Sequence, residues 1–123
     1  MTGIARIVLL LALPLMLAVP ARAAPVTLVC HGGEPPDDVI ELDAGNGVAR
    51  FVQNIFIAGQ TRPVSVDDSA IVIQFAPNTR WVINRATGVL VVYDLFNGAW
   101  QPRGAGMKGV DTICRRATGD LLR

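Results

Sequence analysis

Few side chains of this chain could carry out chemistry, and the first of them is its single histidine, His31. Three carboxylates follow it closely, Glu34, Asp37 and Asp38, and their oxygens could hold a hard cation beside the imidazole. Hydrolytic triads and most protein zinc sites also need a histidine, but a single one supports neither strongly. Prolines interrupt the acidic residues, as is typical of a solvated loop. We therefore expect no metal ion and no cofactor at this segment.

An enzyme would need a nucleophile or a pair of facing carboxylates. Ser65 or Ser69 could complete a triad with His31 and an aspartate, but neither has the glycine-flanked spacing of a nucleophile elbow. Two carboxylates about 5 to 9.5 Å apart could cleave a glycan, yet most acidic residues fall in expected turns. We expect a non-enzymatic role, and a hydrolase built on clustered carboxylates such as Asp37 and Asp38 is the alternative.

Aromatic side chains near one expected hairpin offer a different chemistry, which is binding. Tyr93, Phe96 and Trp100 flank Asn97-Gly98, the strongest short hairpin signal in the chain. Aromatic rings there can stack on a sugar or anchor a protein interface, and arginines add paired hydrogen bonds to acidic groups. The arginines considered with them are Arg80, Arg85 and Arg103. The alternative is that the rings close one end of the core, which we expect for Tyr93 and Phe96 and leave open for Trp100.

The start of the chain has the three parts of a cleavable export signal. Arg6 supplies positive charge, residues 7–19 form an apolar run, and the small residues Ala21 and Ala23 lie two apart. About 13 apolar residues at roughly 1.5 Å each reach about 20 Å, short of the roughly 30 Å hydrocarbon layer of a membrane. The expected organisation is a signal peptide at residues 1–23 and a single domain at residues 24–123, located in the periplasm or secreted.

Removal of the signal leaves a nearly neutral domain. Without Arg6 and Arg22, the 11 basic side chains fall to nine, against 10 acidic ones, for a net charge of about −1. Nucleic-acid binding needs clustered cations that neutralise phosphates, and no such cluster is present in the sequence. The same lack of basic residues argues against binding to a membrane surface after cleavage.

Two cysteines, Cys30 and Cys114, lie near opposite ends of the expected domain. In an exported chain, an even number of cysteines favours an internal disulfide. Such a bond would enclose about 85 residues and stabilise the fold by about 4 to 5 kcal/mol in the chain-entropy model. The alternative is a reactive thiol at Cys30 beside His31, which an oxidising compartment with a partner cysteine disfavours.

The domain is expected to be all-β. Apolar residues alternate over short segments that change phase at turn signals, and no window has a helical period. The expected strands are residues 26–30, 39–42, 48–57, 61–66, 70–75, 80–84, 89–96, a short segment from residue 100, and residues 110–114. Seven to nine antiparallel strands with short turns can form a small barrel or a two-sheet sandwich. One disulfide would then close either architecture.

Particular residues predict the irregularities of these strands. Residues 48–57 are less regular than the others, and we expect a bulge there. Pro63 cannot donate a backbone hydrogen bond and therefore marks a strand start or a sheet edge. Gly88 ends a tight hairpin by supplying a positive φ. Asp43 and Asp67 are expected to act in turns rather than in calcium loops.

The layout from Cys30 to Cys114 resembles that of the periplasmic C-type lysozyme inhibitors. An exported domain of about 100 residues, a loop after the first cysteine and a closing strand that ends in the second carry this resemblance, and residues 106–109 (Gly-Met-Lys-Gly) are similar to part of a tryptophan-lysine-glycine element of that family. The resemblance implies a small antiparallel β barrel and an inhibitor of a lysozyme-type hydrolase. The family's serine-glycine inhibitory loop has no counterpart here, so no inhibitory residue is carried over. Residues 84–88 also look like a hairpin of small exported β-rich proteins of Gram-negative bacteria.

These observations together predict an exported, non-enzymatic binding or envelope-associated domain whose partner is a protein or glycan of the cell envelope. The predicted binding residues are Trp100, Tyr93, Arg85 and Arg103. The alternatives are the inhibitor and the hydrolase described above.

Overall fold

The structure, a computed structural model, describes residues 24–32, 35–103, 112–118 and 122. These residues are all-β and contain no helix. Their strands are β1 (Val26–His31), β2 (Asp38–Asp43), β3 (Val48–Gln53), β4 (Thr61–Val66), β5 (Ala70–Ala76), β6 (Thr79–Asn84), β7 (Val89–Phe96), β8 (Ala99–Pro102) and β9 (Thr112–Arg116). The expected signal peptide, Glu34, Val110 and residues 106–109 lie outside the described residues.

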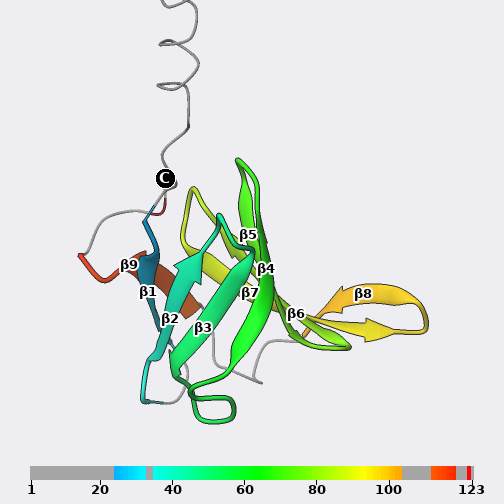
Figure 1. Cartoon of the computed structure of the whole chain (residues 1–123). Coiled ribbons are helices and arrows are strands. Elements are labelled where there is room, and N and C mark those ends of the chain that lie inside the picture. The colour runs from blue at the N-terminus through cyan, green and yellow to red at the C-terminus, as the bar shows by residue number, and fades with distance from the viewer. Residues whose placement is uncertain (1–23, 33–34, 104–111, 119–121, 123) are drawn as a thin grey trace, which may run out of the picture.

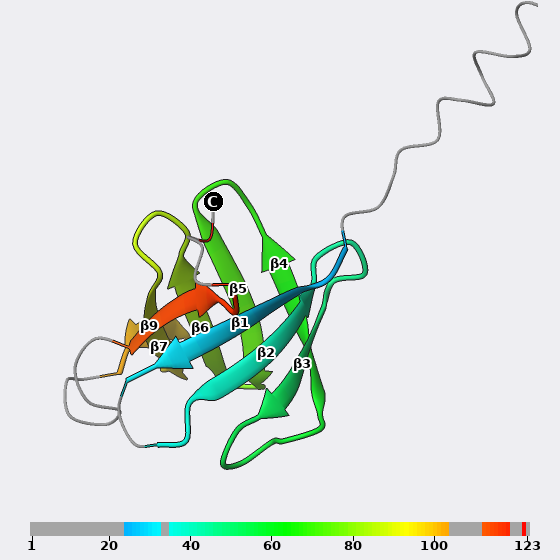
Figure 2. The same ribbon diagram turned by 90° about the vertical axis from the view of Figure 1, so that its left-hand side faces the viewer.

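Eight of the nine strands form a closed antiparallel barrel (Figures 1 and 2). Their order around the barrel is β6-β5-β4-β3-β2-β1-β9-β7, and a further β6–β7 pairing closes the circle. The last strand, β9, is inserted between β1 and β7. The remaining strand, β8, pairs with β7. Of the two expected architectures, the chain therefore adopts the barrel.

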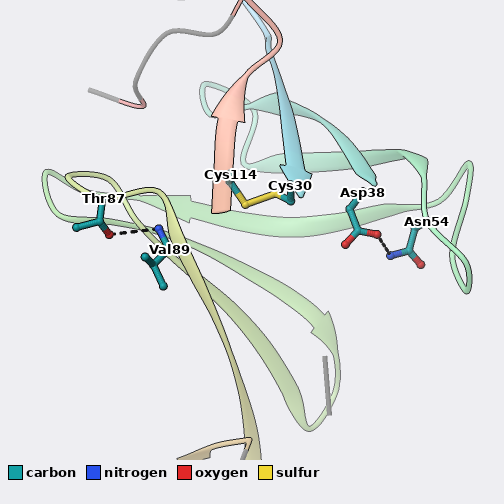
Figure 3. The surroundings of a disulfide bond; sticks show 6 residues. All are labelled: Cys30, Asp38, Asn54, Thr87, Val89 and Cys114. Carbon is teal, nitrogen blue, oxygen red and sulfur yellow. Dashed lines mark hydrogen bonds between the residues drawn. A yellow bond between two sulfur atoms is a disulfide. The ribbon is translucent and has the colours of Figure 1, made fainter. Parts of the chain in front are cut away.

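The expected disulfide is formed. Cys30 and Cys114 face each other in the β1–β9 register, are bonded, and are each 1% exposed (Figure 3). Both cysteines lie on the buried face of their strands, as the alternation predicted. The bond joins the first strand of the barrel to the last one.

The barrel interior is filled by alternate side chains of the strands. Phe51, Phe75 and Trp81 form its aromatic centre, in which Phe75 and Trp81 stack with ring centroids 4.7 Å apart and Phe51 meets both rings edge-on. Ile40, Ile73 and Ile83 are fully buried beside them. The predicted inward faces of β5 and β6 are confirmed, since pleated strands send successive side chains to opposite faces.

On β7, however, the inward face consists of Leu90 and Val92. The larger apolar set that shares one face, Val89, Val91, Tyr93 and Leu95, lies outside and is half-buried. Alternation alone does not say which of two apolar faces is inward.

The loops gather at the two ends of the barrel because neighbouring strands run antiparallel. One end, called here the loop end, carries residues 32 and 35–37, residues 54–60, the β5–β6 turn and the tip of the β7–β8 hairpin. The opposite end, called the turn end, carries residues 44–47, 67–69 and 85–88, with Leu122 buried against it (Figure 1).

The turns of the turn end are held by short polar side chains. The Asp43 carboxylate accepts hydrogen bonds from the backbone and side-chain nitrogens of Asn46. The Asp67 carboxylate accepts from the backbone N–H groups of Ser69 and Ala70, and these bonds hold the pKa of Asp67 below its ordinary value. Turn chemistry, as predicted, accounts for both aspartates.

Two strand predictions differ from the structure. The segment at residues 48–57 ends as a strand at Gln53, because Asn54 turns the chain into a loop through its own side-chain bonds. The expected irregularity is present as a register shift between Val39 and Ile40 in the β2–β3 pairing. Pro63 is neither a strand start nor a sheet edge, since it lies within β4 between two neighbouring strands. The β4–β5 pairing begins only at Val64, after the proline that lacks an N–H, and the Val64 N–H itself donates to the Gly47 oxygen beside β3.

Candidate binding surface at the loop end

The β7–β8 hairpin extends beyond the closed barrel (Figure 1). Its tip is the predicted Asn97-Gly98 turn, in which both residues have positive φ, 51° and 77°, as a tight hairpin requires. The barrel closes through β6 and β7, so β8 is not part of the closure. β8 instead extends the sheet beyond the closed barrel as a short edge strand.

A charged cluster fixes the base of this hairpin. The Arg103 guanidinium donates to both oxygens of the Asp94 carboxylate, at 2.8 and 2.7 Å, and the Thr79 hydroxyl donates to the same carboxylate at 3.1 Å. Hydrogen bonding from Arg103 lowers the pKa of Asp94, and the carboxylate in turn raises the pKa of Arg103. Two parallel bonds define one geometry, so they hold β8 against β7.

The outward face of the hairpin carries two of the aromatic residues that the sequence singled out, Tyr93 and Trp100. The Arg80 guanidinium lies over the Trp100 ring, 3.9 Å from its centroid, and donates to the Gln74 side chain. Tyr93 is in register with Arg80 on one side and with Pro102 on the other. Gln74, Arg80 and Tyr93 are in register across β5 to β7, and Trp100, opposite Leu95, lies diagonally beside them on the same face. These four residues are here called the hairpin face. All four side chains are half-buried.

An open depression of about 390 Å³ adjoins the hairpin face. It is lined by Pro63, Val64, Ser65, Val72, Gln74 and Arg80. It lies where β4 and β5 begin to pair, beside the proline that cannot donate to that ladder. Arg80 and Gln74 belong to both surfaces, so a ligand on the hairpin face could extend into the depression.

Several large apolar side chains are exposed at the same end of the barrel. Phe96, at the hairpin tip, is 62% exposed, and Ile55 and Phe56, in the loop after β3, are 54% and 72% exposed. This loop is held in shape by Asn54, whose side-chain oxygen accepts from the N–H groups of Phe56 and Ile57. Ile55 and Phe56 are adjacent in one loop and Phe96 is on a separate hairpin, and exposed apolar side chains of this kind are found at interaction sites. The loop end therefore exposes large apolar side chains, and the loop that carries Ile55 and Phe56 is held in one conformation by Asn54.

The acidic cluster near His31 is divided by the structure. The Asp37 carboxylate accepts a hydrogen bond from His31 Nδ1 at 2.7 Å on the surface. Asp38 is 6% exposed and accepts from the Asn54 side chain (Figure 3). Within the described residues, no group of three or more His, Cys, Asp or Glu side chains is placed to hold a metal ion. The two aspartates point to different surroundings and do not form a facing pair.

The four predicted binding residues are distributed unevenly. Trp100 and Tyr93 lie together on the hairpin face, whereas Arg103 lies beside them but is occupied by Asp94. Arg85 lies at the turn end, where it donates to the backbone oxygens of Asp67 and Leu122, and so is not part of this surface. The expectation that Tyr93 and Phe96 close the core is wrong, since one lies on the outer face and the other is mostly exposed.

Sequence reasoning missed the exposed loop at Ile55 and Phe56. The apolar pattern continues through both residues and therefore predicts a strand there. Asn54, which favours turns by bonding to the backbone that follows it, was the available signal.

Comparison of the chain with protein-family models, with curated proteins and with solved structures gives no match. In the part of the chain that the structure describes, no helix is long and apolar enough to cross a membrane. The disulfide is typical of proteins that fold in an oxidising compartment. The loop end, with its braced hairpin and exposed apolar tips, is the candidate functional site of this small disulfide-bonded β barrel.

Proposed function

We propose that this protein is an exported, non-enzymatic binding module that attaches to a protein of the cell envelope through its β7–β8 hairpin. The supporting observation is that β8 and the tip of the hairpin are not needed to close the barrel, yet they are held against β7 and expose an aromatic side chain. The Asp94–Arg103 pair and the Arg80–Trp100 stack hold the hairpin, and Phe96 is 62% exposed at its end. An element that is ordered before binding loses less conformational freedom when it binds.

The chemistry of the hairpin suits a protein surface with an apolar pocket and nearby acidic groups. Phe96 is an apolar anchor of the type that dominates interface energies, and Trp100 and Arg80 belong to the residue types enriched there. The guanidinium over the Trp100 ring is placed to meet a carboxylate of the partner. Half-buried Tyr93 and Leu95 lie with Trp100 on the outward face of the hairpin, whereas Phe96 projects from the opposite face at the tip.

The test is capture of a partner by the oxidised protein from an extract of its own envelope. Phe96→Ser should reduce capture by at least tenfold, because truncating a central aromatic anchor typically costs about 2 kcal/mol or more. Val48→Ser is the matched control, since Val48 is 38% exposed but begins β3 at the turn end. Equal loss of capture in both variants, or in neither, would contradict the assignment to the hairpin.

Trp100→Ala is an independent test of whether the hairpin face contacts the partner. If Trp100 contacts the partner, its removal should abolish capture while the unfolding temperature changes by only a few degrees. Loss of stability with unchanged capture would mean that Trp100 serves the fold through Arg80 and not the partner.

A second candidate is inhibition of a lysozyme-type hydrolase. It is favoured by the convex shape of the hairpin, which projects from the barrel as an element able to enter a substrate cleft (Figure 1). It predicts a one-to-one complex that slows hydrolysis of the cell-wall polymer, and Phe96→Ser should relieve the inhibition. Absence of a complex at micromolar concentrations would remove this candidate.

A further inference from the structure

The turn end of the barrel contains a cavity that the proposed function does not use. Its volume is about 190 Å³. The aliphatic side chains that line it are Val26, Leu28, Leu42, Val66 and Ile71. Its size is similar to that of an apolar protein cavity of about 150 Å³ that accommodates benzene. The cavity can therefore hold a small apolar group.

This cavity is accessible from the solvent. Ala24 and Ala44, which line it, are exposed, and Val66 is 37% exposed. Leu122, which is 4% exposed, packs against the same space from the C-terminal segment. A ligand could therefore enter at the rim, between the first residues of the domain and the turn after β2.

Two arginines, Arg85 and Arg116, complete the lining, and no lining residue is acidic. The Arg85 side chain donates to two backbone oxygens, Nη1 to Asp67 at 2.6 Å and Nε to Leu122 at 3.3 Å. A guanidinium has five N–H groups, so three of those of Arg85 make no hydrogen bond with the described residues. Both of its acceptors are uncharged.

The nearest acidic influence on Arg85 comes from the Asp67 side chain. Arg85 contributes to the lowered pKa of Asp67, but hydrogen bonds from Ser69 and Ala70 contribute more. Among the described residues, none of the ion pairs within 4.0 Å includes Arg85. Arg85 therefore places a positive charge at the edge of an apolar cavity without a carboxylate within ion-pair distance among the described residues.

We propose that the turn-end cavity binds a small organic carboxylate with an aliphatic tail, such as a short-chain fatty acid. The tail lies among the aliphatic side chains, and the carboxylate accepts hydrogen bonds from the Arg85 guanidinium. Planar guanidinium and carboxylate groups pair through two parallel bonds, which favours this anion over a neutral head group. The site is at the opposite end of the barrel from the hairpin face.

The test is titration of the oxidised, isotope-labelled protein with hexanoate, followed by NMR shifts of Leu28 and Ile71, with hexanol as the neutral probe. We expect saturable one-to-one binding of hexanoate that is at least tenfold tighter than that of hexanol, since hydrogen bonds to charged groups are the stronger ones. Arg85→Gln should remove this preference. Equal affinity for the two probes would overturn the carboxylate assignment.

Ala44→Phe tests the cavity without changing a charge. The phenyl group should fill the rim and abolish binding of both probes, while exposed Ala44 can be replaced without disturbing the core. Ala86→Phe is the matched control, because Ala86 is an exposed turn residue at the same end that does not line the cavity. If Arg85→Gln fails to fold, the Ala44 and Ala86 variants still decide whether the site exists. Absence of saturable shifts in the native protein, or unchanged binding in Ala44→Phe, would overturn the proposal.

Discussion

Two features of the backbone at Gly88 disfavour any residue with a side chain at this position. Its φ is +78°, in the left-handed region, and a Cβ there would lie 2.5 Å from the carbonyl oxygen of Cys114. The close approach is required because the Cys114 N–H donates to the Gly88 oxygen. Figure 3 shows the neighbours of Gly88, Thr87 and Val89, near Cys114. Gly88 is therefore part of the closure of the barrel and not only of a turn.

Replacement of Gly88 by alanine should destabilise the barrel by about 3 kcal/mol, from backbone strain together with displacement of β9. Gly98→Ala is the matched control, because Gly98 has nearly the same φ, +77°, but no atom within 4 Å of its Cβ position. It should cost only about 1 to 2 kcal/mol. Urea unfolding of the two variants measures the difference, and equal losses would mean that the contact with Cys114 costs nothing.

The Asp94 carboxylate should make the stability of the protein depend on acid pH. Its pKa is lowered in the folded protein, mainly by Arg103, so the folded state binds this proton less readily than the unfolded chain. The stabilisation is fully present above the ordinary value of 3.8 and is lost as pH falls below it. The side chain is 39% exposed, so solvent screening limits the effect to about 1 kcal/mol.

Asp94→Asn should therefore be less stable than the native protein at pH 6, and this deficit should shrink as pH falls below 3.8. Glu41→Gln is the control, because the Glu41–Arg50 pair is long, at 3.8 Å, and about half exposed on both sides. It should change stability by less than about 0.5 kcal/mol. Chemical denaturation at several pH values measures both variants. A deficit of the Asp94 variant that does not shrink toward acid pH would be inconsistent with the ion pair.

The loop after β3 depends on one buried side chain. Asn54 is 7% exposed, donates to the Asp38 carboxylate at 2.9 Å and accepts from the backbone of Phe56 and Ile57. These three bonds connect the loop to β2 and present Ile55 and Phe56 to solvent. The exposed apolar pair is thus held in position by a polar residue beneath it.

Asn54→Ala should lower the free energy of unfolding by about 2 to 3 kcal/mol, because it deprives buried polar groups of a partner. It should also speed hydrogen exchange at the amides of Phe56 and Ile57. Asn46→Ala, in the exposed turn after β2, is the control and should cost less than about 1 kcal/mol. Unchanged protection of the two amides would show that the loop is held by other contacts.

Strands were predictable from this sequence where one face is apolar and turn residues bound it. Ile71, Ile73, Trp81 and Ile83 satisfy both conditions and lie inside the barrel. The end of β3 was not predictable, because Ile55 and Phe56 continue the apolar pattern into a loop. The conformation of this loop depends on a contact between Asn54 and Asp38, which lies sixteen residues earlier in the sequence. Such a contact depends on the pairing of β2 with β3, which periodicity does not report.

The candidate site was only partly predictable for the same reason. Tyr93 and Trp100 are neighbours in sequence across a hairpin, so their proximity followed from Asn97-Gly98. The position of Arg80 over Trp100 depends on the β6–β7 register, and the distance of Arg85 from both follows from its place at the other end of β6. Hairpin contacts are local, whereas the assignment of residues to barrel ends requires the strand order.

The two ends of the barrel carry different kinds of connections between strands. The turn end has tight turns held by Asp43, Asp67 and Asn84, whereas the loop end carries the longer connection after β3 and the projecting hairpin. Sheet closure removes the exposed edges on which small β domains aggregate, and it leaves β8 as a short edge containing Pro102. This arrangement allows one end to contact a partner without exposing the barrel strands themselves.

Closure depends on β9, which fills the position between β1 and β7 and is bonded to β1 by Cys30–Cys114 (Figure 2). The bond spans a sequence separation of 84 residues, for which the chain-entropy model gives about 4 to 5 kcal/mol. This is comparable with the entire stability of many small domains, so the double variant Cys30→Ala/Cys114→Ala should be largely unfolded or melt far below the native protein. Thermal unfolding of the native protein with and without reductant provides the same comparison without mutation, and the double variant, which lacks thiols, should not respond to reductant. A reduced protein that unfolds at the native temperature would mean that packing and the β1–β9 ladder alone close the barrel.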